Sequence, residues 1–466
     1  MFLTSSVVSI NIRSPRLFKL NLTGNQFALF KKINELYEKV FILESLVGPR
    51  ELSEISIIGF DPEITVFCDT KKFCVSNRKE VIKKVDVTEP ISQLRKIMPR
   101  ISDQRFRYFG GAVGYVSYDA IHFWEKIRSK AKEKKYCFPL IEFGIYTDGL
   151  LYNHSENQAY YFSVGKQSRL KEIQEKMEKI DIHKIPQSLS YTRPKRTVTK
   201  NHFIKMVNKS KRYIYNGDIY QVVLSKNIKF IVKGNLIVFY EHLRKINPSP
   251  YMFMLRMKER CIIGSSPEML LRVTKGIVET FPIAGTRQVV KDRKENQRLR
   301  NDLLNDEKEL AEHTMLVDLA RNDIGKVCKY GTVKVQDFLS IKRFSHVQHI
   351  VSHVIGHLRE DTDSYDAFKA VFPAGTVSGA PKIRAMEIID ELEPDSRGPY
   401  AGAIGYFSFN GSCDFAITIR SLFVNHQDAY IQSGAGIVTD SVPQNEWTET
   451  NQKAAALHLA LSKTKG

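Results

Sequence analysis

The sequence predicts a mixed α/β (α+β) fold, in which helices and strands alternate along a soluble chain. Apolar residues recur at helical spacing in several segments, and short runs rich in Val, Ile and aromatic residues lie between them. Of the 466 residues, 42% are hydrophobic and 26% charged, as is usual for a globular protein. This length suits two or three ordinary domains or one large composite domain.

The first part of the chain, residues 1–185, mixes both kinds of element. Residues 25–37 repeat apolar side chains at helical spacing, whereas the runs 56–59 and 64–67 read as strands. The glycine-rich run 109–115 is expected to be a tightly packed strand, because no strand–loop–helix context supports a nucleotide loop.

The second part, residues 200–466, follows a basic, proline-containing segment at 184–200 that is expected to be a linker. A strand-rich run is predicted at 220–232. Helices are predicted at 201–215, 294–321, 381–392 and 444–461, the second of them as one long helix.

The composition excludes several classes of protein. No apolar run approaches the roughly 20 residues that a membrane span needs, and the N-terminus lacks the basic region of a signal peptide. Six scattered cysteines form no CxxC pair, which fits a reducing cytoplasm and no zinc site. The net charge of +19 allows a nucleic-acid-binding protein, but no helix-turn-helix or RRM pattern supports it. A lysine-rich surface that attracts an anionic substrate is the simpler interpretation.

Two glycine-punctuated stretches near the C-terminus are the strongest local signal. They are PAGTVSGAPK at 373–382 and SGAGIV at 433–438. Glycine loops offer free backbone N–H groups to anions. The second stretch leads into a helix that begins with acidic residues, so the pair suggests a site for an anionic substrate and a divalent metal.

Three charged residues of this last helix share one face, because Glu446, Glu449 and Lys453 are spaced i, i+3 and i+7. Glu312 lies on the helix predicted at 294–321. Carboxylates from two helices are ligands that Mg²⁺ commonly receives from protein. Spacing alone, however, favours two solvated acidic faces.

Two further residues have open interpretations. Arg420 ends an apolar strand and is either a salt-bridge partner or a clamp for a substrate carboxylate. His349 is flanked by apolar residues, where a histidine is more often part of the core than of a catalytic site.

Eight motifs carry a resemblance to a known family. They are LES at 43–45, GDIYQVVLS at 217–225, NPSPYMF at 247–253, GSSPE at 264–268, PIAGT at 282–286, AEHTMLVDLARND at 311–323, and the stretches at 373–382 and 434–438. The chain resembles the chorismate-utilising enzymes, and among them the large subunits (component I) of anthranilate synthases. The similarity runs nearly end to end and is most specific from residue 200 onward.

The resemblance implies a fold and a reaction. The family fold has two orthogonally packed antiparallel sheets surrounded by helices, with an active-site cleft between them and subdomains that interleave. The implied activity is that of a lyase of tryptophan biosynthesis: ammonia adds at C2 of chorismate, the C4 hydroxyl leaves, and elimination of pyruvate gives anthranilate. Residues 200–466 would form the chorismate-binding catalytic domain.

The resemblance also implies roles for individual residues. Mg²⁺ would be bound by Glu312 and Glu449, with Glu446 helping through water. Glu268 matches the general acid, and His349 the histidine linked to pyruvate elimination. The contacts to the substrate carboxylates match Gly285, Thr286, Tyr400, Arg420, Gly434, Ala435 and Gly436, with Thr376 and Lys453 completing that shell.

Two positions bear on the product. Isochorismate and salicylate synthases have a water-activating lysine where Gln221 stands, and a glutamine has no basic nitrogen. Typical aminodeoxychorismate synthases of the folate pathway have a lysine where Ala284 stands. Anthranilate is therefore the expected product, and aminodeoxychorismate synthase component I is the alternative.

The resemblance implies two kinds of partner. No cysteine has the glycine flanks of the family's glutaminase, so ammonia is expected from a separate glutamine amidotransferase subunit in a hetero-oligomer. Residues 1–185 would contribute to a feedback site for tryptophan, whose residues match Ser45, Pro250, Tyr251 and Met252. Glu54 stands where the family often has an arginine, which leaves tryptophan inhibition open.

Overall fold

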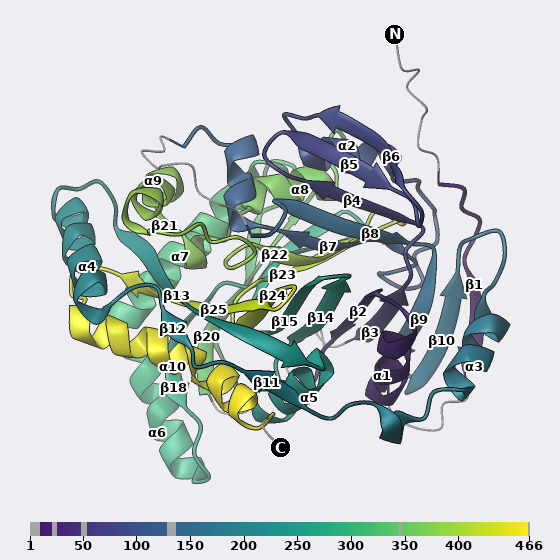
Figure 1. Ribbon diagram of the computed structural model, residues 1–466. Coiled ribbons are helices and arrows are strands. Elements are labelled where there is room, and N and C mark those ends of the chain that lie inside the picture. Colours follow the sequence, from purple (N-terminus) through teal and green to yellow (C-terminus); the bar gives the residue numbers. More distant parts are fainter. Residues whose placement is uncertain (1–9, 21–25, 48–53, 128–136, 344–346, 465–466) are drawn as a thin grey trace.

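Two large antiparallel sheets form the computed structural model, which describes residues 10–20, 26–47, 54–127, 137–343 and 347–464 (Figure 1). The first sheet has 13 strands. In spatial order they are β1 (Arg16–Leu20), β10 (Gln158–Ser163), β9 (Asp148–Asn153), β3 (Ile55–Phe60), β2 (Lys39–Glu44), β14 (Tyr251–Met257), β15 (Arg260–Ser266), β24 (Ser421–Asn425), β25 (Asp428–Ile437), β13 (Gln221–Gly234) and β11 (Leu189–Tyr191), with β12 (Lys195–Arg196) and β21 (Gly379–Ala380) also paired to β13.

The second sheet has 12 strands. Their order is β18 (Ile283–Gln288), β20 (Val347–His357), β17 (Ile277–Thr280), β16 (Met269–Thr274), β23 (Cys413–Ile417), β22 (Ala403–Ser408), β7 (Gly111–Val116), β8 (Ile141–Tyr146), β4 (Ile64–Cys68), β5 (Lys72–Ser76) and β6 (Val81–Asp86), with β19 (Lys334–Arg343) paired to β20. The expected pair of antiparallel sheets with helices is confirmed.

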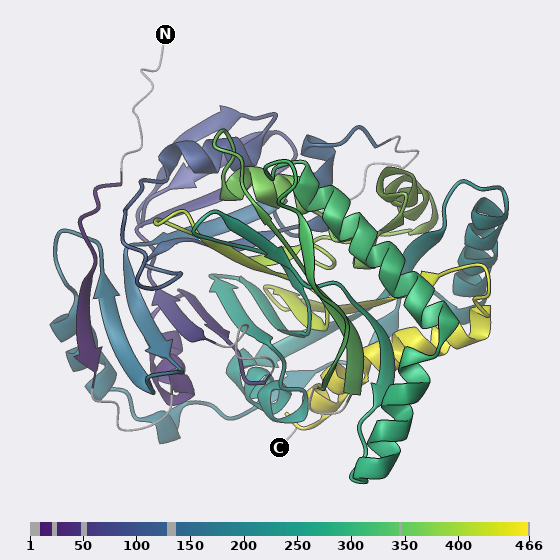
Figure 2. The same ribbon diagram turned by 180° about the vertical axis from the view of Figure 1, so that it is seen from behind.

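Helices surround the sheets. They are α1 (Gln26–Leu36), α2 (Pro90–Ile97), α3 (Leu170–Glu178), α4 (Lys200–Tyr215), α5 (Leu236–Ile246), α6 (Arg293–Leu304), α7 (Glu307–Gly325), α8 (Ser364–Val371), α9 (Lys382–Leu392) and α10 (Pro443–Ser462), with 3₁₀ turns η2 (Tyr118–Phe123), η3 (Ile182–Lys184) and η4 (Gly375–Val377). Helices α1 and α3 lie at one end of the molecule and α4 and α9 at the other, and α10 runs from the second end toward the middle (Figure 1). Helix α6 projects from the body, as the rear view also shows (Figure 2). In the described part of the chain, no helix combines the length and apolar character needed to cross a membrane.

Strands from the two halves of the sequence pair with each other in both sheets. Strand β2 pairs with β14 in the first sheet, and β7 pairs with β22 in the second. The similar runs GAVGY and GAIGY are therefore direct neighbours, with Gly114 opposite Gly405. A Cβ on Gly114 would lie 2.0 Å from the Glu142 carbonyl oxygen, so close backbone packing requires glycine there.

Side chains that alternate along β2 pack into two different hydrophobic clusters. Val40 and Ile42 face the helices, where they pack in a cluster with residues of α1, α5 and α10. Phe41, between them, belongs to the larger cluster that lies between the two sheets. Because successive side chains of a strand point to opposite faces, an apolar run such as VFI can be buried on both sides.

The structure corrects three expectations from the sequence. The helix expected at 294–321 is two helices, because Asp306 caps a new one by accepting a hydrogen bond from the Glu309 N–H. The expected linker at 184–200 contains β11 and β12, which pair with β13. Pro381 precedes α9 as its N-cap instead of lying in its first turn.

Candidate active site

A cleft of about 740 Å³ lies where the two sheets meet helices α7 and α10. Its walls come from β13 and β25 of the first sheet and β18 and β20 of the second. It is lined by nearly all of the residues expected in the active site: Glu268, Gly285, Thr286, Glu312, His349, Thr376, Tyr400, Arg420, Gly434, Gly436, Glu446, Glu449 and Lys453. Segments that are far apart in sequence therefore converge on one cavity.

Helix α10 presents its acidic residues to the cleft. Glu446 is only 8% exposed, and its Oε2 atom is buried with no hydrogen-bond partner among the described residues. Burial, reinforced by the nearby Glu449 charge, raises the pKa of Glu446. Glu449 pairs with Lys453 at 2.6 Å. The shared face predicted from spacing is present, and it faces the cavity and not only solvent.

Helix α7 brings Glu312 to the same cleft. Its Oε1 atom accepts a hydrogen bond from Gln221 Nε2 on β13 at 2.8 Å. One turn earlier, the pKa of Glu309 is raised by burial and by the Glu312 charge. Several carboxylates thus share one cavity and repel one another, and a bound cation would offset this repulsion.

The acidic residues fit a magnesium site of the kind in which protein supplies few ligands. Among the described residues, no three His, Cys, Asp or Glu side chains gather closely enough to hold a metal by themselves. Mg²⁺ usually takes one or two carboxylates and completes its octahedron with water and substrate oxygens. The unpartnered Glu446 oxygen and the carboxylates of Glu312 and Glu449 are suitable donors for such a site.

Glu268 follows β15 at the base of the cleft and is 8% exposed. Its backbone is fixed at both ends, because its N–H donates to the Ser266 hydroxyl and its carbonyl accepts from the Ile417 N–H. Burial raises the pKa of its carboxyl to about 7, although the Thr376 hydroxyl and the charges of Lys453 and Arg420 oppose the rise. A carboxyl with this pKa can hold a proton near neutral pH.

His349 lies on β20 directly opposite Thr286 of β18. It is 6% exposed, and burial lowers its pKa to about 4, so the ring is neutral. Nδ1 lies 2.9 Å from the Gly285 carbonyl oxygen, which can only accept, so Nδ1 carries the proton and Nε2 does not. His349 is thus a cleft residue with a defined tautomer.

Gly285 produces the irregularity that brings its carbonyl to His349. The register of β18 shifts between Ala284 and Thr286, and Gly285 has φ +62. A Cβ there would lie 2.8 Å from Leu303 Cδ1. The Leu303 methyl could shift to make room, so it is the positive φ that favours glycine at this bulge.

Arg420 lies in the turn between β23 and β24, not within a strand, and has φ 50. An arginine in the left-handed region is uncommon and signals local strain at a site of special demand. The carboxyl whose charge acts on its guanidinium is that of Glu268 in the same cleft, a group that can hold a proton near neutral pH. Of the two interpretations, the geometry favours the carboxylate clamp over the salt bridge.

The second glycine stretch lies on β25 and forms a wall of the cleft. A Cβ on Gly434 would lie 2.9 Å from Tyr400 Oη, and one on Gly436 would lie 2.7 Å from Gln221 Nε2. Ala435 is fully buried and does not line the cavity, because alternation turns its side chain to the other face. Lys453 Nζ donates to the Gly434 carbonyl at 3.2 Å and so joins α10 to this wall.

The sequence did not single out several residues that line the cleft. They include Lys308, Glu309, Gln432 and Gln452, and also Asn247, which begins the motif at 247–253 but was given no role. Lys308 and Glu309 lie four and three residues before Glu312, so helical spacing could have found them. Asn247 and Gln432 come from unrelated segments, and no sequence spacing links them to the site.

The expected tryptophan residues line a separate, smaller cavity of about 50 Å³. Ser45, Pro250, Tyr251 and Met252 all contribute to it. The neighbouring Arg107 is 9% exposed and forms ion pairs with Glu54 and Asp414, at 2.9 and 3.3 Å. Glu54, which stands where the family often has an arginine, is thus paired with Arg107 from another segment.

Several known proteins are similar to this chain in sequence and in fold. Residues 38–458 match the chorismate binding enzyme family. An anthranilate synthase component 1 of Methanothermobacter marburgensis is 45% identical over 449 residues, covering 96% of this chain and 95% of the relative. The crystal structure of anthranilate synthase component I from Streptococcus pneumoniae superposes with a TM-score of 0.76 at 35% identity, covering 89% and 94% of the two chains.

A more distant structure shares the fold alone. The menaquinone-specific isochorismate synthase of Escherichia coli superposes with a TM-score of 0.72 at 20% identity, over 97% of this chain and 95% of that one. The match to the family thus extends over both sheets and the cleft between them. The chain belongs to the chorismate binding enzyme family.

Proposed function

We propose that the protein is an anthranilate synthase component I, a lyase that converts chorismate and ammonia to anthranilate and pyruvate in tryptophan biosynthesis. Relatives of that name are similar over nearly the whole chain. One observation of the cleft carries the chemistry: the proton-holding Glu268 lies in the same cavity as the cation of Arg420 and the acidic faces of α7 and α10. Such a cavity suits a dianion that must lose a hydroxyl group.

We infer that Mg²⁺ is held by Glu312 and Glu449, with Glu446 acting through water. When bound, the metal supplies a Lewis acid that withdraws electron density from the substrate ring through its carboxylate. Lys453, which pairs with Glu449, keeps that carboxylate in the cleft. Gln221 does the same for Glu312.

The remaining residues bind chorismate and move protons. The two substrate carboxylates would be held by one set of cleft residues. They are Arg420, Tyr400, Thr286, Thr376, Gly285, Lys453 and the N–H groups of residues 434–436. Glu268 protonates the leaving C4 hydroxyl, since its pKa of about 7 keeps a proton available. In the second step, the unprotonated Nε2 of His349 accepts the proton lost from C2 as pyruvate leaves.

Two cleft residues favour anthranilate over the products of related enzymes. Gln221 and Ala284 both line the cavity, and neither side chain contains an amine that could activate water or attack the ring. Free ammonia is then the nucleophile. Aminodeoxychorismate synthase, the alternative, would give p-aminobenzoate through a further enzyme.

We expect the isolated chain to form anthranilate from chorismate, Mg²⁺ and ammonium, but not from glutamine. The reason is that ammonia would come from a separate glutaminase subunit in a hetero-oligomer. Chromatographic separation of anthranilate and aminodeoxychorismate checks the product, and parallel reactions with ammonium and glutamine check the nitrogen source. Glutamine-dependent synthesis by the chain alone would refute the separate subunit, and an aminodeoxychorismate product would refute the assigned reaction.

We also propose that tryptophan inhibits through the cavity of Ser45, Pro250, Tyr251 and Met252. Residues 1–185 would contribute Ser45 to this site, and residues 200–466 would contribute the other three residues and the catalytic cleft. Titrating tryptophan against the initial rate tests this, and Ser45→Ala should weaken the inhibition. Full activity at millimolar tryptophan would remove the regulatory proposal.

A further inference from the structure

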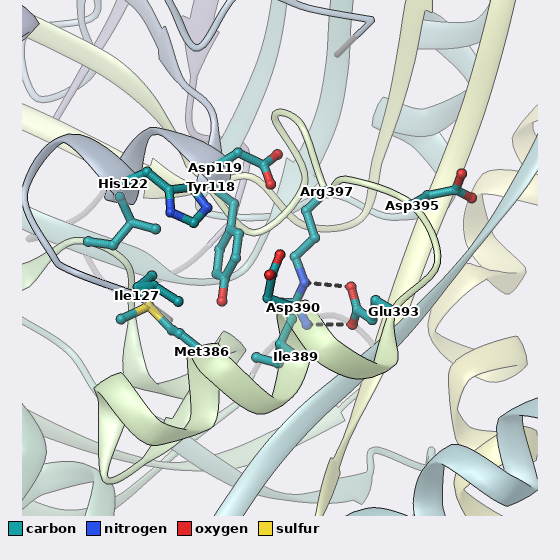
Figure 3. A pocket seen from close by; sticks show the side chains of 11 residues that line it. Tyr118, Asp119, His122, Ile127, Met386, Ile389, Asp390, Glu393, Asp395 and Arg397 are labelled. Atoms are coloured by element: carbon teal, nitrogen blue, oxygen red, sulfur yellow. Dashed lines mark hydrogen bonds and ion pairs between the residues drawn. The ribbon is translucent and has the colours of Figure 1, made fainter. Parts of the chain in front are cut away.

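Arg397 is a buried cation that lies outside the cleft and forms hydrogen bonds with several segments of the cleft wall. It is 1% exposed and lies in the loop after α9, beneath the ring of Tyr118 at 4.6 Å. Its guanidinium forms a two-bond fork with the Glu393 carboxylate, at 2.9 Å from Nε and 2.7 Å from Nη2 (Figure 3). This side-by-side geometry is specific to arginine.

The other donors of the guanidinium hold two backbone segments of the cleft. Nη1 donates to the Val377 carbonyl and Nη2 to the Val223 carbonyl, each at 2.7 Å. Both valines line the cavity, one beside Thr376 and the other opposite Gly436 on β25. One buried cation therefore sets the separation of two substrate-facing walls.

The Glu393 carboxylate extends the network to a third wall. Its Oε1 atom accepts from the Ser225 N–H at 2.7 Å and from the Ser225 hydroxyl at 2.9 Å. Because this hydroxyl donates its only proton to Glu393, it must accept from Gln432 Nε2, which lies 2.8 Å away. The Gln432 amide is thereby oriented with its oxygen as the remaining acceptor, and that buried oxygen has no partner among the described residues.

The backbone of Arg397 reaches a fourth wall. Its carbonyl accepts from the Tyr400 N–H at 3.2 Å and from the Tyr430 hydroxyl at 3.4 Å. Tyr400 lines the cleft.

We propose that Arg397, together with Glu393, is a positioning residue for chorismate: it touches no substrate atom but fixes Thr376, Gln432, Tyr400 and the Val223 backbone in the geometry that binds it. This rests on the proposed function.

The test is Arg397→Lys, because lysine keeps the charge but cannot form the fork and both carbonyl bonds together. We expect the KM for chorismate to rise about tenfold or more, because hydrogen bonds to the substrate carboxylates weaken when the walls that carry their donors are displaced. A purely structural role would reduce the amount of active enzyme and hence kcat, leaving KM unchanged. Arg384→Lys is the control. Arg384 lies on α9, pairs with Glu387 of the same helix and with Asp218 before β13, and does not line the cleft, so the KM of this variant should not change.

A double variant, Arg397→Met with Glu393→Leu, separates positioning from stability. Removing both charges leaves no unpaired buried ion, so the fold can persist while the hydrogen bonds to the walls are lost. We expect a folded protein with a raised KM and a lower melting temperature than the wild type, because the Val223 and Val377 carbonyls and the Ser225 N–H lose their partners. Unchanged KM in either folded variant overturns the proposal, and so does failure of both variants to fold.

Chorismate binding measured by calorimetry distinguishes this proposal from the function itself. If the wild type binds chorismate but forms no anthranilate, the assigned reaction fails. The positioning role still predicts an about tenfold weaker Kd in Arg397→Lys.

Discussion

Replacing Glu449 by Gln should lower the rate of anthranilate formation at least about a hundredfold and remove its response to Mg²⁺. The carboxylate lies on the cleft face of α10, near the unpartnered oxygen of Glu446 and across from Glu312. An amide keeps the shape but loses the charge that a hard cation requires. A Lewis acid is worth several kcal/mol of transition-state stabilisation, and about 2.7 kcal/mol already corresponds to a hundredfold.

Two measurements make this result specific. Mn²⁺ binding, followed by its paramagnetic signal in the presence of chorismate, should weaken in Glu449→Gln and in Glu312→Gln. Glu307→Gln is the matched control, because Glu307 is an exposed carboxylate of α7 that does not line the cleft. Wild-type rates or metal affinity in Glu449→Gln would exclude this residue as a ligand.

Replacing Glu268 by Gln should lower kcat by about a hundredfold to ten-thousandfold, the usual contribution of a general acid. Gln cannot deliver a proton to the leaving hydroxyl. In the wild type, burial raises the pKa of this carboxyl to about 7. The acid form is therefore lost as the pH rises through 7, and kcat/KM should fall about tenfold per pH unit above that value when the concentration of neutral ammonia is held constant.

The pH profile and the stability of Glu268→Gln supply the controls. The residual activity of this variant should lack the alkaline fall, whereas Glu279→Gln, outside the cleft, should keep it. Because the folded-state pKa is raised, the stabilising contribution of wild-type Glu268 is complete below the unfolded pKa and is lost as pH rises through 7. A rise from 4.5 to about 7 corresponds to up to about 3 kcal/mol, so the Gln variant should unfold at higher denaturant than wild type above pH 7. An unchanged alkaline fall in Glu268→Gln would assign the proton to another group.

Local patterns predicted several of the helices and a few of the strands. The apolar repeat at 25–37 corresponds to α1, and the alanine- and leucine-rich run at 444–461 to α10. The prediction failed at 294–321 because an apolar repeat can continue across a break when two helices pack on the same surface. There the capping carboxylate of Asp306, and not the repeat, decides where the second helix begins.

The individual site residues were only partly accessible to sequence reasoning. Spacing placed Glu446 and Glu449 on one helix face, since an α-helix has a fixed period. It could not place Glu312 near them, because the contact spans more than a hundred residues and two helices. Arg397 gave no signal in sequence, since its role lies in carbonyl groups of segments that meet only in the folded chain.

The sequence by itself determined the family of this protein. The glycine stretches and the motifs from residue 200 onward reflect local backbone and side-chain requirements, which can be recognised in the sequence before the fold is known. The sequence also determined that Gln221 and Ala284 stand at the two positions where related enzymes have a reactive lysine. Only the tertiary structure decided the state of the functional groups. Burial gives Glu268 its proton, the Gly285 carbonyl gives His349 its tautomer, and the turn between β23 and β24 places Arg420 in the cleft beside Glu268. Each of these depends on desolvation and on contacts between distant segments, which no local pattern encodes.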